Sequence, residues 1–240
     1  MTTLPAAPEQ PRWRWPLATE AHVYFAPLDR PVFGAATTLS DDERARAARF
    51  HFDRDRRRFI AGRALLRSLL GNYLETPPHK VAFRYDPNGK PRLTGGELSF
   101  NVSHSHSAAV FAFTSERGIG VDIERHPAPD DGDAVARHFF AAAEVTMLDS
   151  LPAAARSAAF LRCWTRKEAY IKARGDGLSL PLDSFEVSLA PGAGPALLAT
   201  RPDPVEAGRW SLVDLSRHCP GYVAALAFEG GDPTLTIAHV

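Results

Sequence analysis

One order of secondary-structure signals occurs twice along the chain, and this repetition constrains the fold more than any other feature. In each half a helical pattern is followed by short strands, the last of them rich in small and aromatic residues, at 107–113 and 222–228. With 240 residues the chain can bury one large core or two modest ones. We therefore predict an α+β fold of two similar α/β subdomains related by a pseudo-twofold duplication. A site at the seam between them would be the natural cleft.

Local signals place the elements of each half. Ser40 and Glu43 form a capping box that begins a helix, a break is expected near 51–53, and a second helix ends near Gly71. An Asp-Pro-Asn-Gly turn predicts a hairpin over 81–93. The other expected elements are an extended arm over the first sixteen residues, strands at 22–25, 98–102, 108–114, 119–124, 184–189, 210–215 and 222–228, and helices at 134–149 and 156–174.

Two carboxylates close the strand 119–124. Side chains at i and i+2 of a strand leave the same face about 7 Å apart, so Asp122 and Glu124 point together while the alternate residues point into a core. Converging like charges repel unless a cation or a proton lies between them, and oxygen ligands are those that Mg²⁺ accepts. The solvent face of an edge strand would explain the same acids. Gly118 and Gly120, however, would permit close approach of the backbone to a ligand.

A third carboxylate lies on the helix predicted over 156–174. Glu168 and Lys172 are four residues apart and so share one helix face, with Trp164 one turn earlier on the same stripe. An acid, a base and an aromatic anchor therefore line up. A surface salt bridge worth a few tenths of a kcal/mol is the structural alternative.

The segment Asn101–Ser107 concentrates hydroxyl and imidazole groups at the end of a strand, which suits phosphate oxygens or a nucleotide. For His106 a satisfied loop histidine is the better interpretation. The same residue types could serve a Ser/His/Asp hydrolase, but no Gly-x-Ser-x-Gly elbow places a serine on a strained turn. A P-loop and a Gly-x-Gly-x-x-Gly fingerprint are also absent from the sequence.

Charge is balanced overall and uneven locally. Lys+Arg and Asp+Glu each number 28, so net charge does not indicate a bulk polyanion partner such as duplex DNA. Nine arginines nevertheless fall between Arg44 and Arg67. This run is either a solvated helix face or a phosphate clamp.

The two cysteines, Cys163 and Cys219, have no metal-ligand spacing and are expected to be small buried side chains. The N-terminal residues lack the apolar segment of a signal peptide, and no stretch approaches the length of a membrane span. A cytoplasmic location with no membrane partner is therefore expected.

In combination these motifs resemble the paired signature of the 4′-phosphopantetheinyl transferases. The two signature blocks are Ile119–Glu124 and Trp164–Lys172, and Asp122 and Glu168 stand 46 positions apart, as the family pattern requires. Three more segments of the chain are similar to sequence motifs of the larger, Sfp-like class of this family: Phe100–Ser105, Gly89–Pro91 and Gly175–Asp183. The length also favours this monomeric, pseudo-duplicated class over the small trimeric holo-acyl-carrier-protein synthases.

The resemblance implies an enzyme that moves the phosphopantetheine arm of coenzyme A to a serine of an apo acyl or peptidyl carrier protein, releasing adenosine 3′,5′-bisphosphate. By similarity, Asp122, Glu124 and Glu168 would hold Mg²⁺, for which Mn²⁺ could substitute. Glu168 would deprotonate the serine, and Lys172 would bind the pyrophosphate. Spacing leaves open whether Glu124 binds the metal directly or through water.

The resemblance also assigns the coenzyme A contacts. Ser103 and His104 would touch its phosphates, and Lys90 and Pro91 would border the adenine pocket. The 3′-phosphate would meet arginines of the basic run, namely Arg46, Arg58 and Arg63. Carrier recognition is expected on an apolar patch near Phe139, Phe140 and Met147, for which burial in the core is the alternative.

We accordingly expect an N-terminal subdomain over 1–117 with the coenzyme A 3′-phosphate and adenine contacts. The C-terminal subdomain, 118–240, would carry the metal carboxylates and the catalytic helix. Two alternatives stay open at this point. The same acids could serve a metal-dependent phosphohydrolase of a nucleotide, or the arginine run could make the chain a nucleic-acid-binding module, although the run lacks the interleaved exposed aromatics typical of such modules.

Overall fold

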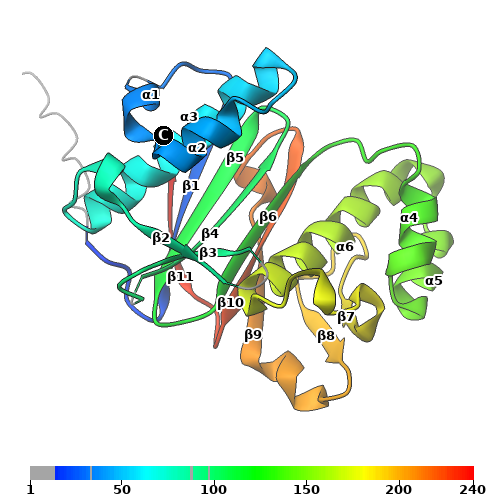
Figure 1. The fold of residues 1–240 in the computed structure, drawn as a ribbon. Coiled ribbons are helices and arrows are strands. Elements are labelled where there is room, and N and C mark those ends of the chain that lie inside the picture. The colour runs from blue at the N-terminus through cyan, green and yellow to red at the C-terminus, as the bar shows by residue number, and fades with distance from the viewer. Residues whose placement is uncertain (1–13, 33, 87–88, 97) are drawn as a thin grey trace, which may run out of the picture.

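The computed structural model describes residues 14–32, 34–86, 89–96 and 98–240. Within them, a four-stranded sheet with the order β11-β1-β5-β4 lies beside a three-stranded sheet with the order β6-β10-β9. Figure 1 shows a long helix with each of these sheets, α3 on the first and α6 on the second.

The first half contains β1 (Glu20–Pro27), α1 (Ala35–Thr38), α2 (Asp41–Ala47), α3 (Asp53–Tyr73), β2 (Phe83–Tyr85), β3 (Pro91–Leu93), β4 (Leu98–Ser105) and β5 (Ala108–Ser115). The second half contains β6 (Ile119–Arg125), α4 (Gly132–Phe139), α5 (Ala142–Ser150), α6 (Ala153–Arg174), β7 (Phe185–Val187), β8 (Leu197–Thr200), β9 (Trp210–Asp214), β10 (Tyr222–Glu229) and β11 (Thr234–His239). Short 3₁₀ turns include η1 (Pro78–Lys80), η2 (Gly177–Ser179), η3 (Leu182–Ser184), η4 (Pro204–Arg209) and η5 (Ser216–His218).

The two halves have the same topology, which confirms the predicted α+β duplication. Each runs strand, long helix, two-stranded hairpin and two further strands, and the last of these lies between the first strand and the strand before it. Thus β5 pairs antiparallel with β1 and β4, and β10 pairs antiparallel with β6 and β9.

A letter-by-letter alignment of the two central strands is wrong by one position. It would pair Phe113 with Phe228, but Phe113 packs in the core beneath α3 while Phe228 packs in the core between the sheets. Successive side chains of a strand point to opposite faces, so a shift of one residue exchanges the two cores. The shared composition marked equivalent strands but did not fix their register.

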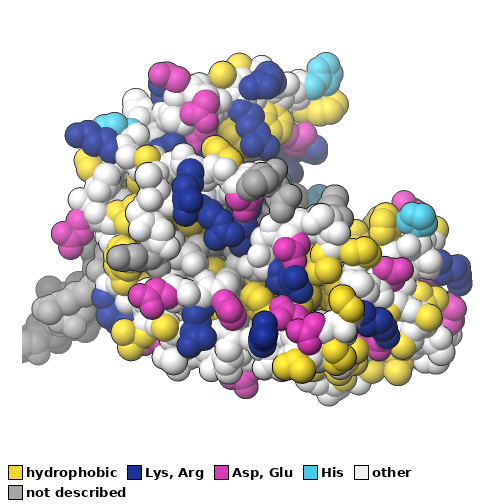
Figure 2. All heavy atoms as spheres, turned by 60° about the horizontal axis from the view of Figure 1, so that its bottom comes forward, with side chains coloured by type: hydrophobic (Ala, Val, Ile, Leu, Met, Phe, Trp, Pro, Cys, Tyr) yellow, Lys and Arg dark blue, Asp and Glu magenta, His cyan; other side chains and the backbone are white. Residues whose placement is uncertain are grey.

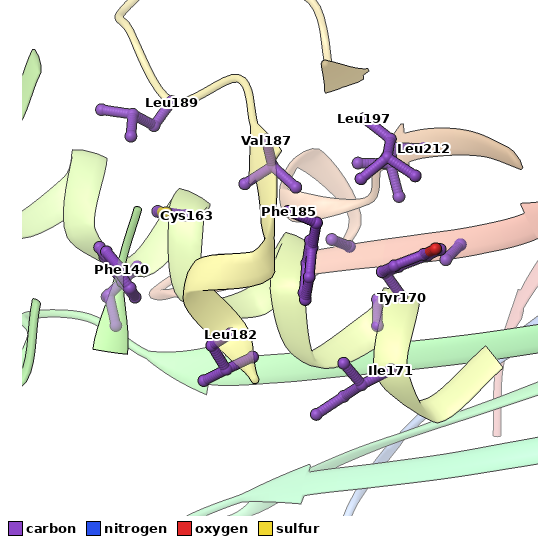
Figure 3. Close-up of a cluster of buried hydrophobic side chains, with 14 of the residues drawn as sticks. Phe140, Cys163, Tyr170, Ile171, Leu182, Phe185, Val187, Leu189, Leu197 and Leu212 are labelled. Atoms are coloured by element: carbon purple, nitrogen blue, oxygen red, sulfur yellow. The ribbon is translucent and has the colours of Figure 1, made fainter. Parts of the chain in front are cut away.

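Among the described residues, three hydrophobic cores separate the layers of helix and sheet. One lies between α3 and the first sheet, one between the two sheets, and one between α6, the second sheet and the β7-β8 hairpin. Figure 3 shows the third core, where Tyr170 of α6 meets Phe185 of β7 with ring centroids 4.9 Å apart. Cys163 and Cys219 are buried, as predicted.

Several element predictions need correction. The helix expected over 134–149 is two helices, α4 and α5, and the strands β8 and β11 were not predicted. β11 pairs parallel with β1, so the end of the chain returns to the sheet of the first half. The division at residue 117 stays a prediction. The extended arm was expected over 1–16, of which 1–13 lie outside the described residues.

The seam between the halves is bridged by side chains of β4. The amide oxygen of Asn101 accepts a hydrogen bond from the backbone N–H of Val121 at 2.9 Å, and Ser105 Oγ accepts one from Arg125 N at 3.2 Å. Asn101, Ser103 and Ser105 alternate along β4 and so share the face turned toward β6. This periodicity explains why polar residues recur at every second position of the segment.

Gly120 serves the packing of α6. A Cβ at this position would lie 2.1 Å from the carbonyl oxygen of Ala169 and 2.3 Å from the nitrogen of Ala173, both on α6. The expectation that this glycine opens the strand to a ligand is therefore wrong, because backbone of the helix fills the space. The close approach instead brings α6 onto β6. Among the described residues, no helix has the length and apolarity needed to span a bilayer.

Candidate active site

The predicted carboxylates line one cavity at the seam. This carboxylate cavity has a volume of about 320 Å³ and is bordered by residues of β4, β6 and α6. Its lining consists of Val102, Ser103, His104, Asp122, Glu124, Trp164, Glu168 and Lys172. Side chains from three separate elements therefore meet where the sequence predicted them.

Asp122 is the most buried member of this group. Its Oδ1 accepts hydrogen bonds from Lys172 Nζ at 2.6 Å and from Ser103 Oγ at 2.8 Å, and Lys172 Nζ also contacts Ser103 Oγ at 3.1 Å. The helix α6 and the strands β4 and β6 are thus joined through one carboxylate. Asp122 Oδ2 is buried and has no hydrogen-bond partner among the described residues.

The other two carboxylates complete an acidic surface. Glu124 Oε2 accepts a hydrogen bond from Ser105 Oγ at 2.8 Å, whereas Glu168 projects from α6 into the same cavity. Burial raises the pKa of Asp122, of Glu124 and of Glu168. The charges of Asp122 and Glu124 raise the pKa of Glu168 further, and Lys172 opposes this effect. The cavity therefore favours a proton or a cation among its oxygens.

The donor set fits a hard divalent cation. Carboxylate oxygens are the ligands that Mg²⁺ accepts, and the unpartnered Asp122 Oδ2 supplies a buried oxygen for it. Among the described residues, however, no three His, Cys, Asp or Glu side chains come together as a metal-ligand group, and the Lys172 ammonium lies against Asp122. The metal site stays a prediction.

A larger cavity adjoins the first. This arginine cavity has a volume of about 710 Å³ and shares Val102 and His104 with the carboxylate cavity. Lys90 and Pro91 line it, as do the three arginines assigned to the 3′-phosphate, Arg46, Arg58 and Arg63. Burial lowers the pKa of His104, and the nearby charge of Lys172 lowers it further. His104 is thus a neutral hydrogen-bonding group between the two cavities at neutral pH.

The three arginines differ in their existing partners. Arg58 forms a two-point ion pair with Asp29, at 2.6 and 2.9 Å, and Arg63 pairs with Glu43. The Arg46 guanidinium stacks over the ring of Phe59 at 5.3 Å, and no described carboxylate pairs with it. Arg46 is therefore the arginine best able to take a new anion.

The arginine run does not form one solvated face. Arg67 is buried and pairs with Glu43 at 2.6 Å, so the end of the run belongs to the interior. On the face shown in Figure 2, Lys and Arg side chains are interspersed with Asp and Glu. Neither observation favours a polyanion-binding surface.

Some lining residues were not assigned from the sequence. Ser105 orients Glu124, and Arg54, Phe50 and Phe59 line the arginine cavity. Ser105 carried a usable signal, because it follows Asn101 and Ser103 at the strand period. The sequence held no signal that singles out Arg54 among the nine arginines, because the orientation of α3 in the fold decides which of them face the cavity.

Comparison with known proteins assigns the family. The model described as 4′-phosphopantetheinyl transferase superfamily matches residues 118–227, and the model described as 4′-phosphopantetheinyl transferase, N-terminal, matches 25–116. The chain is 42% identical to the 4′-phosphopantetheinyl transferase HetI of Nostoc sp. over 88% of this chain and 90% of HetI. The chain belongs to the 4′-phosphopantetheinyl transferase superfamily.

Other relatives agree with this assignment. This transferase is 31% identical to the 4′-phosphopantetheinyl transferase Sfp of Bacillus subtilis over 70% of its own length and 76% of Sfp. It is 32% identical to the L-aminoadipate-semialdehyde dehydrogenase-phosphopantetheinyl transferase of Xenopus laevis over 65% of its own length and 56% of that protein. The predicted resemblance is confirmed, and the phosphohydrolase and nucleic-acid alternatives find no support in these matches.

Proposed function

We propose that this transferase moves the 4′-phosphopantetheine arm of coenzyme A to a serine of an apo acyl or peptidyl carrier protein. One observation carries the proposal: a carboxylate cavity with Asp122, Glu168 and Lys172 opens beside an arginine-lined cavity, with His104 bordering both. The arginine cavity would take the adenosine 3′-phosphate end of coenzyme A, with Lys90 and Pro91 beside the adenine. The carboxylate cavity would take the pyrophosphate.

The reaction is a displacement at phosphorus. The serine oxygen forms a bond to the β-phosphorus of coenzyme A, and the bond from that phosphorus to the bridging oxygen breaks. Adenosine 3′,5′-bisphosphate leaves with the bond electrons, and the serine proton goes to Glu168. Such transfers need in-line positioning and charge neutralisation more than covalent catalysis.

Glu168 is suited to accept that proton. A serine hydroxyl is a weak nucleophile at neutral pH, and a general base contributes on the order of 10²- to 10⁴-fold. Burial and the neighbouring acids raise the pKa of Glu168, which makes it a stronger base than an exposed carboxylate. Among the residues that the structure describes, none donates a hydrogen bond to the Glu168 carboxylate, so no such bond would have to break.

Lys172 and Ser103 would bind the pyrophosphate oxygens. Lys172 Nζ now lies against Asp122, so its charge is already held at the cavity. Asp122, Glu124 and Glu168 would hold Mg²⁺, or Mn²⁺ in its place, and the bound metal would neutralise phosphate oxygens during transfer. From this position Lys172 would offset the negative charge that develops on the departing bisphosphate.

The carrier would dock beside the carboxylate cavity, on α4 and α5. Phe139 and Met147 are 43% and 41% exposed and can form an apolar contact surface. Phe140 is only 4% exposed and stacks on Phe160 at 5.4 Å, so its expected place in this surface is wrong. We infer that a single copy of the chain suffices, because all of the proposed contacts come from one protomer.

The test is incubation with coenzyme A, Mg²⁺ and an apo carrier protein, with the mass of the carrier as readout. The native chain should add the phosphopantetheine mass, and Glu168→Gln should lower kcat by about 10²- to 10⁴-fold. Glu75→Gln, at an exposed carboxylate outside both cavities, is the matched control and should act as the native chain does. An unmodified carrier with the native chain would overturn the proposal.

A further inference from the structure

The ammonium of Lys90 reaches across the seam to the end of the catalytic helix. Lys90 lies between β2 and β3 of the first half, and its Nζ donates a hydrogen bond to the carbonyl oxygen of Lys172 on α6. Ala173 O and Ile119 O lie at 3.5 Å from the same nitrogen, at the limit of hydrogen bonding. One side chain thus contacts the end of α6 and the beginning of β6.

These carbonyls need a partner. The last four carbonyls of a helix have no intrahelical donor, and Lys172 and Ala173 lie in the last turn of α6, which ends at Arg174. Gly175 N satisfies the carbonyl of Ile171 at 3.0 Å. A cation at this end also interacts favourably with the helix dipole. Lys90 therefore caps the end of α6 by donating to a carbonyl that the residues of the helix do not bond.

The capped backbone carries the catalytic groups. Lys172 Nζ holds Asp122 at 2.6 Å, and Asp122 is three residues after Ile119 on β6. Helix ends fray unless their terminal groups are bonded, and fraying here would displace Lys172 directly. Because Lys90 contacts both backbones, it fixes the distance between the elements that carry Asp122 and Lys172.

The hairpin holds Lys90 in place. Lys90 N donates to Asp86 Oδ1 at 2.8 Å, and Asp86 N donates to Lys90 O at 3.1 Å. The next residue, Pro91, lines the arginine cavity. Burial lowers the pKa of Lys90 to about 8, which agrees with an ammonium enclosed between the two halves.

We propose that Lys90 is a positioning residue, whose ammonium clamps the end of α6 to β6 and so holds Lys172 and Asp122 in their reactive arrangement. This inference rests on the proposed function for its kinetic part. A residue that only borders the adenine pocket would change the KM for coenzyme A. A residue that positions Lys172 changes kcat at saturating coenzyme A.

Chemical rescue tests the clamp. Lys90→Cys removes the ammonium, and alkylation with 2-bromoethylamine rebuilds it as an aminoethyl thioether of nearly the same length. The two native cysteines, Cys163 and Cys219, are both buried, whereas residue 90 is partly exposed and lines the arginine cavity, so the new thiol is the more accessible one. Alkylation with iodoacetamide is the matched control, because it adds a side chain of similar size without a charge.

Lys90→Cys should lower kcat by about 10- to 100-fold, with the KM for coenzyme A changed less than three-fold, roughly the cost of a small misplacement of a reacting group. Aminoethylation should restore kcat, and carbamidomethylation should not. Arg84→Met removes a basic side chain whose hydrogen bond among the described residues stays within the same hairpin, to Leu93 O, and should leave kcat unchanged.

Amide hydrogen exchange separates failure of the clamp from failure of the proposed function. In Lys90→Cys the amides of residues 171–175 and 119–122 should exchange about ten-fold faster, and aminoethylation should restore their protection, whether or not transfer is observed. A change in KM alone, or rescue by iodoacetamide, would overturn the proposal. Unchanged exchange at both segments would do so as well.

Discussion

The face of β1 turned toward α3 and the face of β6 turned toward α6 occupy equivalent places in the two halves and carry different chemistry. On β1 this face presents His22 and Tyr24, which bond the hydroxyl of Tyr73 on α3 at 2.8 and 2.7 Å. On β6 it presents Asp122 and Glu124, which meet α6 at the carboxylate cavity. The two halves share the same arrangement of sheet and helix, but only the face of β6 carries converging acids.

A buried ion pair is the feature that both copies retain. Arg67 of α3 pairs with Glu43 at 2.6 Å, and Lys167 of α6 pairs with Glu144 at 2.8 Å. Arg67 also donates hydrogen bonds to the carbonyl oxygens of Pro78 and Val81, which precede the β2-β3 hairpin. Lys167 likewise donates to the carbonyl oxygens of Leu182 and Phe185, which lie just before and at the start of the β7-β8 hairpin. Each acid lies at the third position of a short helix and accepts a backbone N–H at that helix start. The same kind of buried ion pair therefore stabilises the arrangement of sheet and helix in each half, independently of the candidate active site.

The largest expected effect tests that equivalence. Glu144→Gln and Glu43→Gln should each cost about 3–5 kcal/mol of unfolding free energy, because each leaves a buried cation without its counter-charge. Urea unfolding of both variants measures this. Asp41→Asn, which breaks an exposed pair with Arg44, is the control and should cost under about 1 kcal/mol. A small cost at only one of the two buried sites would break the comparison.

An intermediate effect is expected at the helix contact. Gly120→Ala should cost about 1–3 kcal/mol, because its Cβ would overlap the backbone of Ala169 and Ala173. Gly62→Ala on α3 is the counterpart control, since its Cβ would meet Leu28 at an ordinary 3.7 Å. That change should stabilise the protein by about 0.5–1 kcal/mol. Equal thermal shifts in the two variants would show that α6 can retreat from β6 without loss.

The smallest effect concerns pH, and its sign differs between the two faces. The raised pKa of Glu168 means that the folded state binds its proton more tightly than the unfolded state. Stability from this group is present at low pH and is lost as pH rises above 4.5 through the folded pKa. Glu168→Gln should therefore stabilise the metal-free protein at pH 7 by about 0.5–2 kcal/mol.

His22 sharpens the same comparison. Burial lowers its pKa below 6.5, so its contribution is present above pH 6.5 and is lost as pH falls through the folded pKa. Thermal unfolding from pH 4 to pH 8 should show Glu168→Gln gaining most at the upper end of the range and His22→Asn changing the slope at the lower end. The same slope in native chain and both variants would contradict the opposite electrostatics of the two faces.

Patterns that extend over a few residues were predictable. The capping box at Ser40, the helix end at Gly175 and the alternation of β6 each depend on neighbours in the chain, and the structure has them close to their predicted places. The meeting of Asp122, Glu168 and Lys172 was predicted through the family pattern rather than from the geometry of single elements. Helix and strand periods alone cannot say which two elements will touch.

The sequence by itself determined the duplicated order of elements, the face on which each acid lies, and the family. Only the tertiary structure decided that Gly120 yields its space to α6, that Arg63 and Arg67 turn inward to Glu43 while Arg46 stays available, and that Lys90 crosses the seam to the end of α6. The reason is physical. The backbone geometry of a single helix or strand sets the spacing of the residues that share one of its faces. Which distant residue a side chain contacts depends instead on how separate elements pack and on their charges, and no single segment of the sequence specifies this.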